Sequence, residues 1–156
     1  MTGLRGILAG LENSDPLPMP DYTWFGASGA GYAVYRHPMN AEFINEPAVY
    51  LWIARGAFPN GYVLNVGETD DLGRRMNEHR ASSPKWRDAR SMGLFAIDIL
   101  WMPGTTSQER RDVESDLVSA LYPILTERPV PAGRSMAQRT VSSNGLKRVD
   151  SSLLKR

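Results

Sequence analysis

Two polar side chains, Arg75 and His79, stand where the sequence predicts the buried face of a helix. With Leu72 and Met76 they occupy positions i, i+3, i+4 and i+7, the spacing of one helical face. An arginine buried without a partner is costly, so Arg75 must meet a carboxylate, meet a ligand's anion or line a solvated cleft. His79 alone is more typical of a packed core histidine than of a catalytic one, and its pairing with Arg75 makes the two interpretations comparable.

The last predicted helix also carries a charge at its apolar stripe. That stripe consists of Val113, Leu117, Ala120 and Leu121. Glu114 lies on or beside it and has two interpretations. Its carboxylate either forms an ion pair with Arg75 or binds a hard cation such as Mg²⁺, which prefers oxygen ligands. A third polar group, the phenol of Tyr50, stands in an apolar strand, where a tyrosine usually serves packing.

The elements that position these residues follow from local patterns. The apolar runs 48–54 and 62–66 flank the turn residues 59–61 and predict an antiparallel hairpin. Thr69 is the predicted cap of a helix that runs to about Arg80. A second helix over 83–93, a strand over 94–102 and a helix from the capping box Thr106–Glu109 to Tyr122 complete the order β-β-α-α-β-α.

The chain is expected to divide into three parts. Residues 1–45 read as an irregular N-terminal extension, with at most a short strand at Tyr32–Tyr35, and 46–128 read as the folded domain. Residues 129–156 read as a basic tail, because six basic residues from Gly133 onward face a single acidic one. Such a tail either contacts phosphate backbones or only keeps the chain in solution.

Composition excludes several classes of site. The 156 residues contain no cysteine, which rules out disulfides, thiolate metal sites and a cysteine nucleophile. No apolar run approaches the roughly 20 residues that span a bilayer, and the N-terminus lacks a secretory signal. We therefore expect a soluble, cytoplasmic protein without a membrane partner.

Three segments together resemble the GIY-YIG nuclease superfamily. They are "AVY" at 48–50, "NVGETDDLGRRMNEH" at 65–79 and "RRDVESDLVSALYPIL" at 110–125. The family pattern has an arginine eight residues after the glycine of its second strand, the spacing from Gly67 to Arg75. The resemblance implies an α/β (α+β) fold with a small three-stranded antiparallel sheet flanked by helices.

The same resemblance implies a function. Family members hydrolyse phosphodiester bonds, usually in DNA, with a single divalent metal, so Mg²⁺ or Mn²⁺ is the expected cofactor and nucleic acid the expected partner. Carried over, Tyr50 activates the attacking water, Arg75 stabilises the charge on phosphorus and Glu114 binds the metal. His79 matches a histidine that some restriction-enzyme members place near the nucleophile or phosphate. Tyr50 could act as a base only if positive charge lowers its pKa.

Some positions depart from the family pattern. Asn65 replaces a tyrosine, Ala48 replaces a glycine and Thr126 replaces an asparagine. Asn65, Gly67 and Thr126 are the further candidates for substrate contact. The departures leave open a nucleic-acid-binding module that has lost cleavage, or an interaction protein in which Arg75 and Glu114 form only a structural ion pair.

Overall fold

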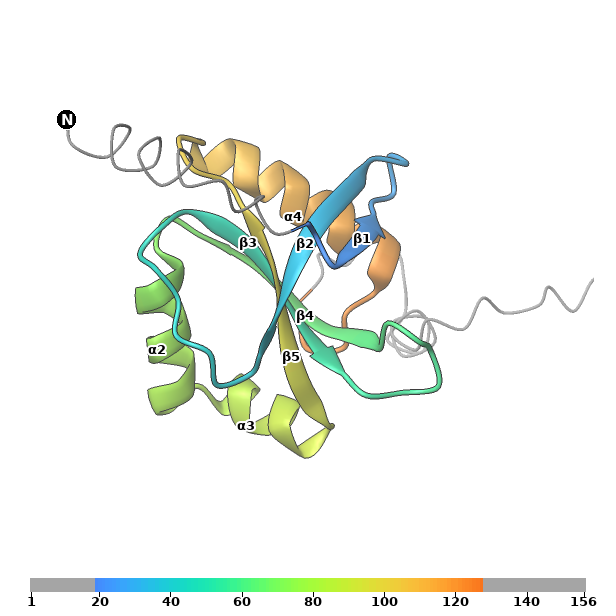
Figure 1. The fold of residues 1–156 in the computed structure, drawn as a ribbon, viewed down its shortest axis with the longest axis vertical. Coiled ribbons are helices and arrows are strands. Elements are labelled where there is room, and N and C mark those ends of the chain that lie inside the picture. The colour runs from blue at the N-terminus through green and yellow to red at the C-terminus, as the bar shows by residue number, and fades with distance from the viewer. Residues whose placement is uncertain (1–18, 128–156) are drawn as a thin grey trace, which may run out of the picture.

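A five-stranded antiparallel sheet organises residues 19–127, the part of the chain that the computed structural model describes. The strand order across the sheet is β1-β2-β5-β3-β4. In sequence order the strands are β1 (Tyr22–Phe25), β2 (Gly31–Pro38), β3 (Ala48–Ala54), β4 (Tyr62–Thr69) and β5 (Leu94–Trp101). The sheet twists strongly, so that its strands cross in Figure 1.

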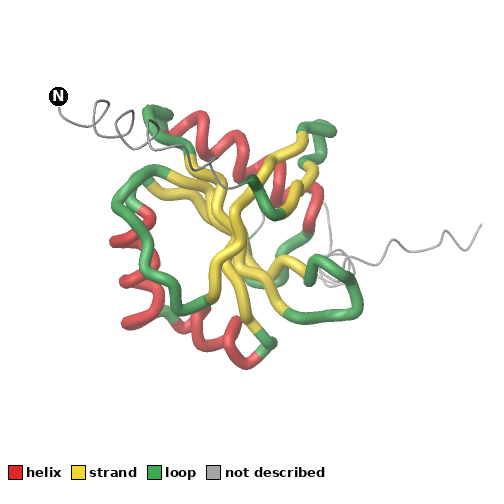
Figure 2. Tube along the Cα trace, in the orientation of Figure 1, coloured by secondary structure: helices red, strands yellow, loops and turns green. Residues whose placement is uncertain are grey.

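Helices cover both faces of this sheet. The helices α2 (Leu72–Ser82) and α3 (Pro84–Ser91) pack on one face, and α4 (Ser107–Leu121) packs on the other (Figures 1 and 2). Two separate apolar clusters result, one on each face. Within residues 19–127, no helix has the length and apolar character needed to cross a membrane.

The strand β3 lies between the two clusters and is buried along its whole length. Its side chains alternate between the faces, as the pleat of a strand requires. Tyr50 and Trp52 join the cluster under α2 and α3, whereas Val49 and Leu51 join the cluster under α4. This explains the continuous apolar run in the sequence, because a strand buried on both faces has no polar side.

The expectation of a three-stranded sheet is wrong, although the class is α+β. Two additional strands, β1 and β2, come from the segment expected to be irregular; the short strand expected at Tyr32–Tyr35 is the middle of the longer β2. β2 pairs with β5 from Tyr35 opposite Ile99 to Pro38 opposite Ala96. The glycine-rich stretch before β2 is the loop of the β1–β2 hairpin, in which Gly29 has a φ of 86°. Because the partner of β2 lies some 60 residues later, no local pattern reveals the pairing.

The Asp116 carboxylate of α4 holds the loop of the β1–β2 hairpin against that helix. Asp116 accepts hydrogen bonds from the backbone N–H of Ser28 (2.8 Å), from its hydroxyl (2.6 Å) and from the Tyr32 hydroxyl (2.7 Å). Gly26 leaves the room for this carboxylate, since a Cβ there would overlap it. These hydrogen bonds, led by that of the Ser28 hydroxyl, lower the pKa of Asp116. The hairpin is therefore an integral part of the fold.

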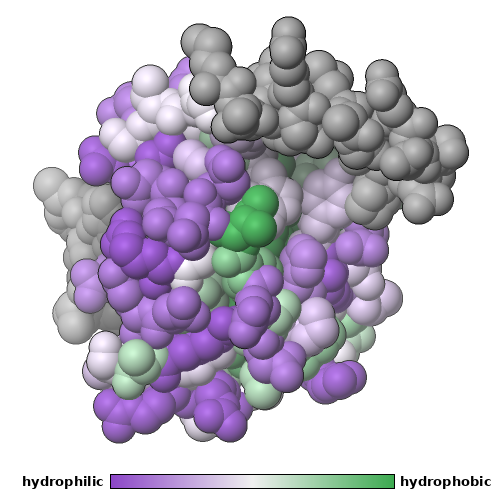
Figure 3. All heavy atoms as spheres, turned by 60° about the vertical axis from the view of Figure 1, so that its left-hand side comes forward, coloured by the Kyte–Doolittle hydropathy of each residue, from purple (hydrophilic) through white to green (hydrophobic). Residues whose placement is uncertain are grey.

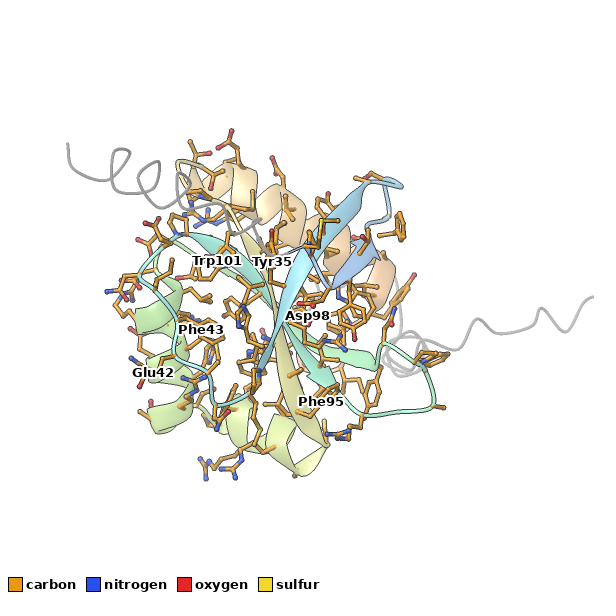
Figure 4. All side chains as sticks on the ribbon, in the orientation of Figure 1. Tyr35, Glu42, Phe43, Phe95, Asp98 and Trp101 are labelled. Carbon is orange, nitrogen blue, oxygen red and sulfur yellow. The ribbon has the colours of Figure 1, made fainter. Side chains whose placement is uncertain are left out.

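An ion pair with a fully buried carboxylate joins β2 to β5. Arg36 donates to both carboxylate oxygens of Asp98, at 2.7 and 2.9 Å, and the Trp24 indole donates at 2.8 Å. Asp98 has no exposed surface and lies near the middle of β5 (Figure 4). Its charge is fully compensated there, as a buried carboxylate requires.

Most local element predictions are confirmed. The strand Ala48–Ala54 and the short helix α3 are where the sequence places them, and the Thr106–Glu109 capping box is formed. The cap of α2 is different. β4 continues to Thr69, and Asp71 caps the helix by accepting from the Arg74 N–H at 2.9 Å. The predicted basic tail at 129–156 and the start of the N-terminal extension lie outside the described residues.

The segment after α4 returns to the free edge of β4. Tyr122 ends the helix in the left-handed conformation, with a φ of 51°. The Leu125 N–H then donates to the Leu64 carbonyl at 2.8 Å, and the Thr126 hydroxyl accepts from the Val66 N–H at 2.9 Å. Backbone groups on the edge of β4 are thereby paired.

Candidate active site

The phenol of Tyr50 lies across the neighbouring strand. Tyr50 pairs with Gly67 of β4, and a Cβ at Gly67 would collide with the phenol carbon and oxygen. The glycine is therefore needed so that the tyrosine can extend over an edge strand. Only 2% of Tyr50 is exposed.

His79 meets Tyr50 from α2. The Tyr50 hydroxyl and the His79 Nε2 are 3.0 Å apart. The imidazole packs edge-on against Trp52, with ring centroids 4.8 Å apart, and Trp52 packs in turn against Trp86 of α3 at 5.0 Å. The prediction that His79 faces inward is confirmed, and these rings fix its orientation.

Burial keeps His79 neutral. It lowers the pKa of His79 from 6.5 to about 4, and the positive charges of Arg75 and Lys85 add to this effect. At neutral pH the ring carries one hydrogen, so Nε2 accepts the Tyr50 hydroxyl when that hydrogen is on Nδ1. In that tautomer His79 is a proton acceptor at the phenol.

The prediction that Arg75 is buried is wrong. Its side chain is 45% exposed and pairs with Glu78 at 3.3 Å, so the alternative of an ion pair with Glu114 is wrong and the alternative of a solvated position remains. The long side chain leaves the flank of α2 and places its guanidinium beside the Tyr50 phenol, an interaction that raises the pKa of Arg75. Arg75 therefore keeps its charge at a solvent-accessible position next to Tyr50.

The pKa of Tyr50 is raised, contrary to what a tyrosine base needs. Burial is the largest cause, and the nearby carboxylates of Glu114 and Glu68 act in the same direction. Arg75 opposes them but does not outweigh burial. Tyr50 is thus a neutral hydroxyl in the protein alone, and any proton transfer through it uses His79 as the acceptor.

Glu114 is a half-buried carboxylate without a hydrogen bond or ion pair to any residue from 19 to 127. Burial raises its pKa, and the charge of Glu68 adds to this effect. A bound cation would offset both. No group of three or more histidines and carboxylates suited to a metal exists within the described residues. Among these residues Glu114 could hold a Mg²⁺ ion only as a single carboxylate ligand, with waters completing the coordination.

Two of the positions that depart from the family pattern are bonded to each other. The Thr126 hydroxyl donates to the Asn65 side-chain oxygen at 2.9 Å, and only 3% of Asn65 is exposed. They lie on adjoining backbone at the edge of β4, beside Gly67. The Asn65 oxygen and the Thr126 hydroxyl are thus occupied within the fold, where they support the sheet edge.

Sequence reasoning missed Lys85. This lysine is half-buried in the first turn of α3 and forms no ion pair within residues 19–127. Its charge lowers the pKa of both His79 and Glu114, which places it in electrostatic range of both. The only sign in the sequence is its position directly before the buried Trp86.

The structure thus groups five polar side chains around the edge of β4. Tyr50, Arg75 and His79 are in mutual proximity, and Glu114 and Lys85 lie within electrostatic range. No protein-family model, curated protein or solved structure matches the chain.

His79 is expected to make stability depend on pH. Its pKa is about 4 in the folded state and 6.5 when unperturbed, so the unfolded state binds more protons between these values. The contribution is complete above pH 6.5 and is lost as the pH falls through 4. At 1.36 kcal/mol per pKa unit it amounts to about 3 kcal/mol.

Urea unfolding at pH 7 and at about pH 4.5 measures this effect. His79→Gln is the comparison, because it removes the titrating ring while the opposite pH dependence of Glu114 stays in both proteins. The wild type should lose more stability on acidification than the variant. Equal losses would show that His79 is not held neutral by burial.

Proposed function

We propose that the chain is a GIY-YIG-type endonuclease that hydrolyses phosphodiester bonds in nucleic acid, with DNA as the substrate and Mg²⁺ or Mn²⁺ as the cofactor. The observation that carries the proposal is the contact of Tyr50 with His79 and Arg75 close to the unpaired carboxylate of Glu114. A cytoplasmic location, which the absence of cysteine favours, is part of the same proposal.

In this proposal Tyr50 and His79 form a two-step proton relay. A water molecule gives its proton to the Tyr50 oxygen as the Tyr50 proton passes to His79 Nε2. The water oxygen forms a bond to phosphorus, and the bond from phosphorus to the leaving oxygen breaks. Solvent then protonates the leaving alkoxide. A neutral imidazole at 3.0 Å has the geometry for this role.

Positive charge surrounds the phosphate in this arrangement. Arg75 can donate from two nitrogens to two phosphate oxygens, since its guanidinium is accessible and planar. Lys85 adds a second charge that no carboxylate of residues 19–127 neutralises by an ion pair. When bound at Glu114, the divalent ion supplies further charge to the phosphoryl group.

A binding module that has lost cleavage is the second candidate. The Asn65–Thr126 hydrogen bond favours it, because these residues occupy the positions where the family has a second tyrosine and an asparagine. Such a module would keep the positive charges of Arg75 and Lys85 but would not need the unpaired Glu114.

The decisive experiment incubates the purified chain with supercoiled plasmid, linear DNA and RNA. Each substrate is tested with Mg²⁺, with Mn²⁺ and with chelator. The proposal expects metal-dependent cleavage of DNA that stops in chelator. Cleavage of RNA alone would correct the substrate, and binding without cleavage in either metal would favour the binding module.

Lys85→Gln is expected to weaken nucleic-acid binding more than Arg87→Gln, its matched control. Arg87 is an exposed residue of the same short helix. Loss of one phosphate contact lowers the slope of log affinity against log salt by about 0.9 on duplex DNA. Fluorescence anisotropy over a range of salt concentrations measures the slope.

A second readout checks where Lys85 lies. Its removal should raise the pKa of His79, which an NMR titration of the ring detects. Equal salt slopes in the two variants would exclude Lys85 from the binding surface.

A further inference from the structure

A buried arginine joins the start of α4 to the end of β4. Only 4% of Arg110 is exposed. Its Nε donates to the Glu68 carboxylate at 3.0 Å, and another guanidinium nitrogen donates to the Thr105 carbonyl at 2.7 Å. Arg110 thus connects the strand, the loop before the helix and the helix itself.

Both partners of this ion pair adjoin the candidate site. Glu68 follows Gly67, over which the Tyr50 phenol lies. Arg110 precedes Glu114 by four residues, so both side chains lie on the same side of α4. The ion pair therefore connects the strand beneath the phenol to the helical face that carries the unpaired carboxylate.

We propose that Arg110 and Glu68 are positioning residues that hold Glu114 at its working distance from Tyr50 and thereby set the affinity for the divalent metal. This inference rests on the proposed function. A guanidinium can bind Glu68 and Thr105 together because its nitrogens point in different directions, which a single ammonium group cannot reproduce. Substitution of residues that support and orient a metal ligand commonly changes the affinity for the metal.

The chain offers a matched control for a purely structural role. Arg36 and Asp98 form another arginine–carboxylate pair, which joins β2 to β5; Asp98 is fully buried and the Arg36 side chain is largely buried. It contacts none of Tyr50, His79 and Glu114. Changing Arg110 to lysine is therefore expected to affect the site, whereas the same change at Arg36 is not.

The experiment compares Arg110→Lys, Glu68→Asp and Arg36→Lys, each of which keeps its charge. Mn²⁺ affinity is measured from its paramagnetic effect on water or protein NMR signals, without nucleic acid. Thermal melting of each variant measures how much stability the substitution removes. Arg110→Lys and Glu68→Asp should weaken Mn²⁺ binding by about 10-fold, and Arg36→Lys should not change it. In cleavage assays the first two should need more metal but approach the wild-type rate when it is saturating.

The outcomes separate the two proposals. If the wild type binds Mn²⁺ and both site variants bind it as Arg36→Lys does, the positioning role is wrong while the proposed function stands. If Glu114→Gln leaves the Mn²⁺ affinity of the wild type unchanged, the metal site is elsewhere and both proposals fail. Should Arg110→Lys not fold, Glu68→Asp alone decides between these results.

Discussion

Glu114→Gln should abolish metal-dependent cleavage and leave the protein folded. The proposal assigns the metal to this carboxylate, and an amide of the same size lacks the charge that would attract a cation. The substitution breaks no hydrogen bond or ion pair to any described residue. It also removes a charge whose burial is unfavourable, as its raised pKa indicates. Stability should therefore be unchanged or slightly higher.

Three measurements on the same preparation test this expectation: plasmid cleavage, Mn²⁺ binding and thermal melting. Asp112→Asn is the control, since Asp112 is an exposed carboxylate two residues earlier on α4. The control should cleave as the wild type does. A Glu114→Gln protein that still cleaves with Mg²⁺, or a wild type that cleaves in chelator, would contradict the metal role.

Arg75→Lys should reduce the rate of cleavage by about 10² to 10³, the usual effect of losing one preorganised donor. Lysine keeps the positive charge but has one nitrogen, so it cannot hold two phosphate oxygens in a fixed plane. The side chain is 45% exposed and its only ion pair is with Glu78 on the same helix, among the residues described. The fold should therefore tolerate the change.

Arg74→Lys provides the comparison for this variant. Arg74 is adjacent, exposed and paired with Asp70, Asp71 and Glu78, and it does not reach Tyr50. Steady-state kinetics should show a fall in kcat for Arg75→Lys that Arg74→Lys lacks. Similar rates for the two variants would mean that Arg75 does not contact the phosphate.

Structural features that depend on only a few neighbouring residues could be predicted from the sequence. The capping box at Thr106 needs only Glu109 three residues later, and β3 is one apolar run between turn residues. The inward position of His79 also follows from helical spacing alone. These elements are correct because their stabilising contacts lie within one turn or one strand.

Features that depend on distant partners were not predictable. β1, and β2 beyond the short strand expected at Tyr32–Tyr35, are stabilised by β5 and by Asp116, which come much later in the chain. The helical spacing of Arg75 gives the direction of its Cβ, but not where its long side chain ends, which is a partly exposed position beside Tyr50. Lys85 belongs to the site only because the Trp52–Trp86 contact packs α3 beside His79.

The two residues that depart from the GIY-YIG pattern at the edge of β4 need to be considered together. Asn65 and Thr126 depart from the pattern together and are hydrogen-bonded to each other. Asn65→Tyr alone would bury a ring where only 3% of the residue is exposed and would leave the Thr126 hydroxyl without this acceptor. Restoring the family tyrosine therefore requires changes at both positions.

The return of residues 123–127 along β4 affects whether the chain can associate with other molecules through its sheet edge. An edge strand with unpaired backbone groups is a template for pairing with another molecule, and long edges lead to aggregation. Here Leu125 and Thr126 already form hydrogen bonds with the Leu64 carbonyl and the Val66 N–H. At the opposite edge, β1 is only four residues long. Loss of this short return segment would leave backbone groups of β4 unpaired and free to pair with another molecule, immediately beside the candidate site.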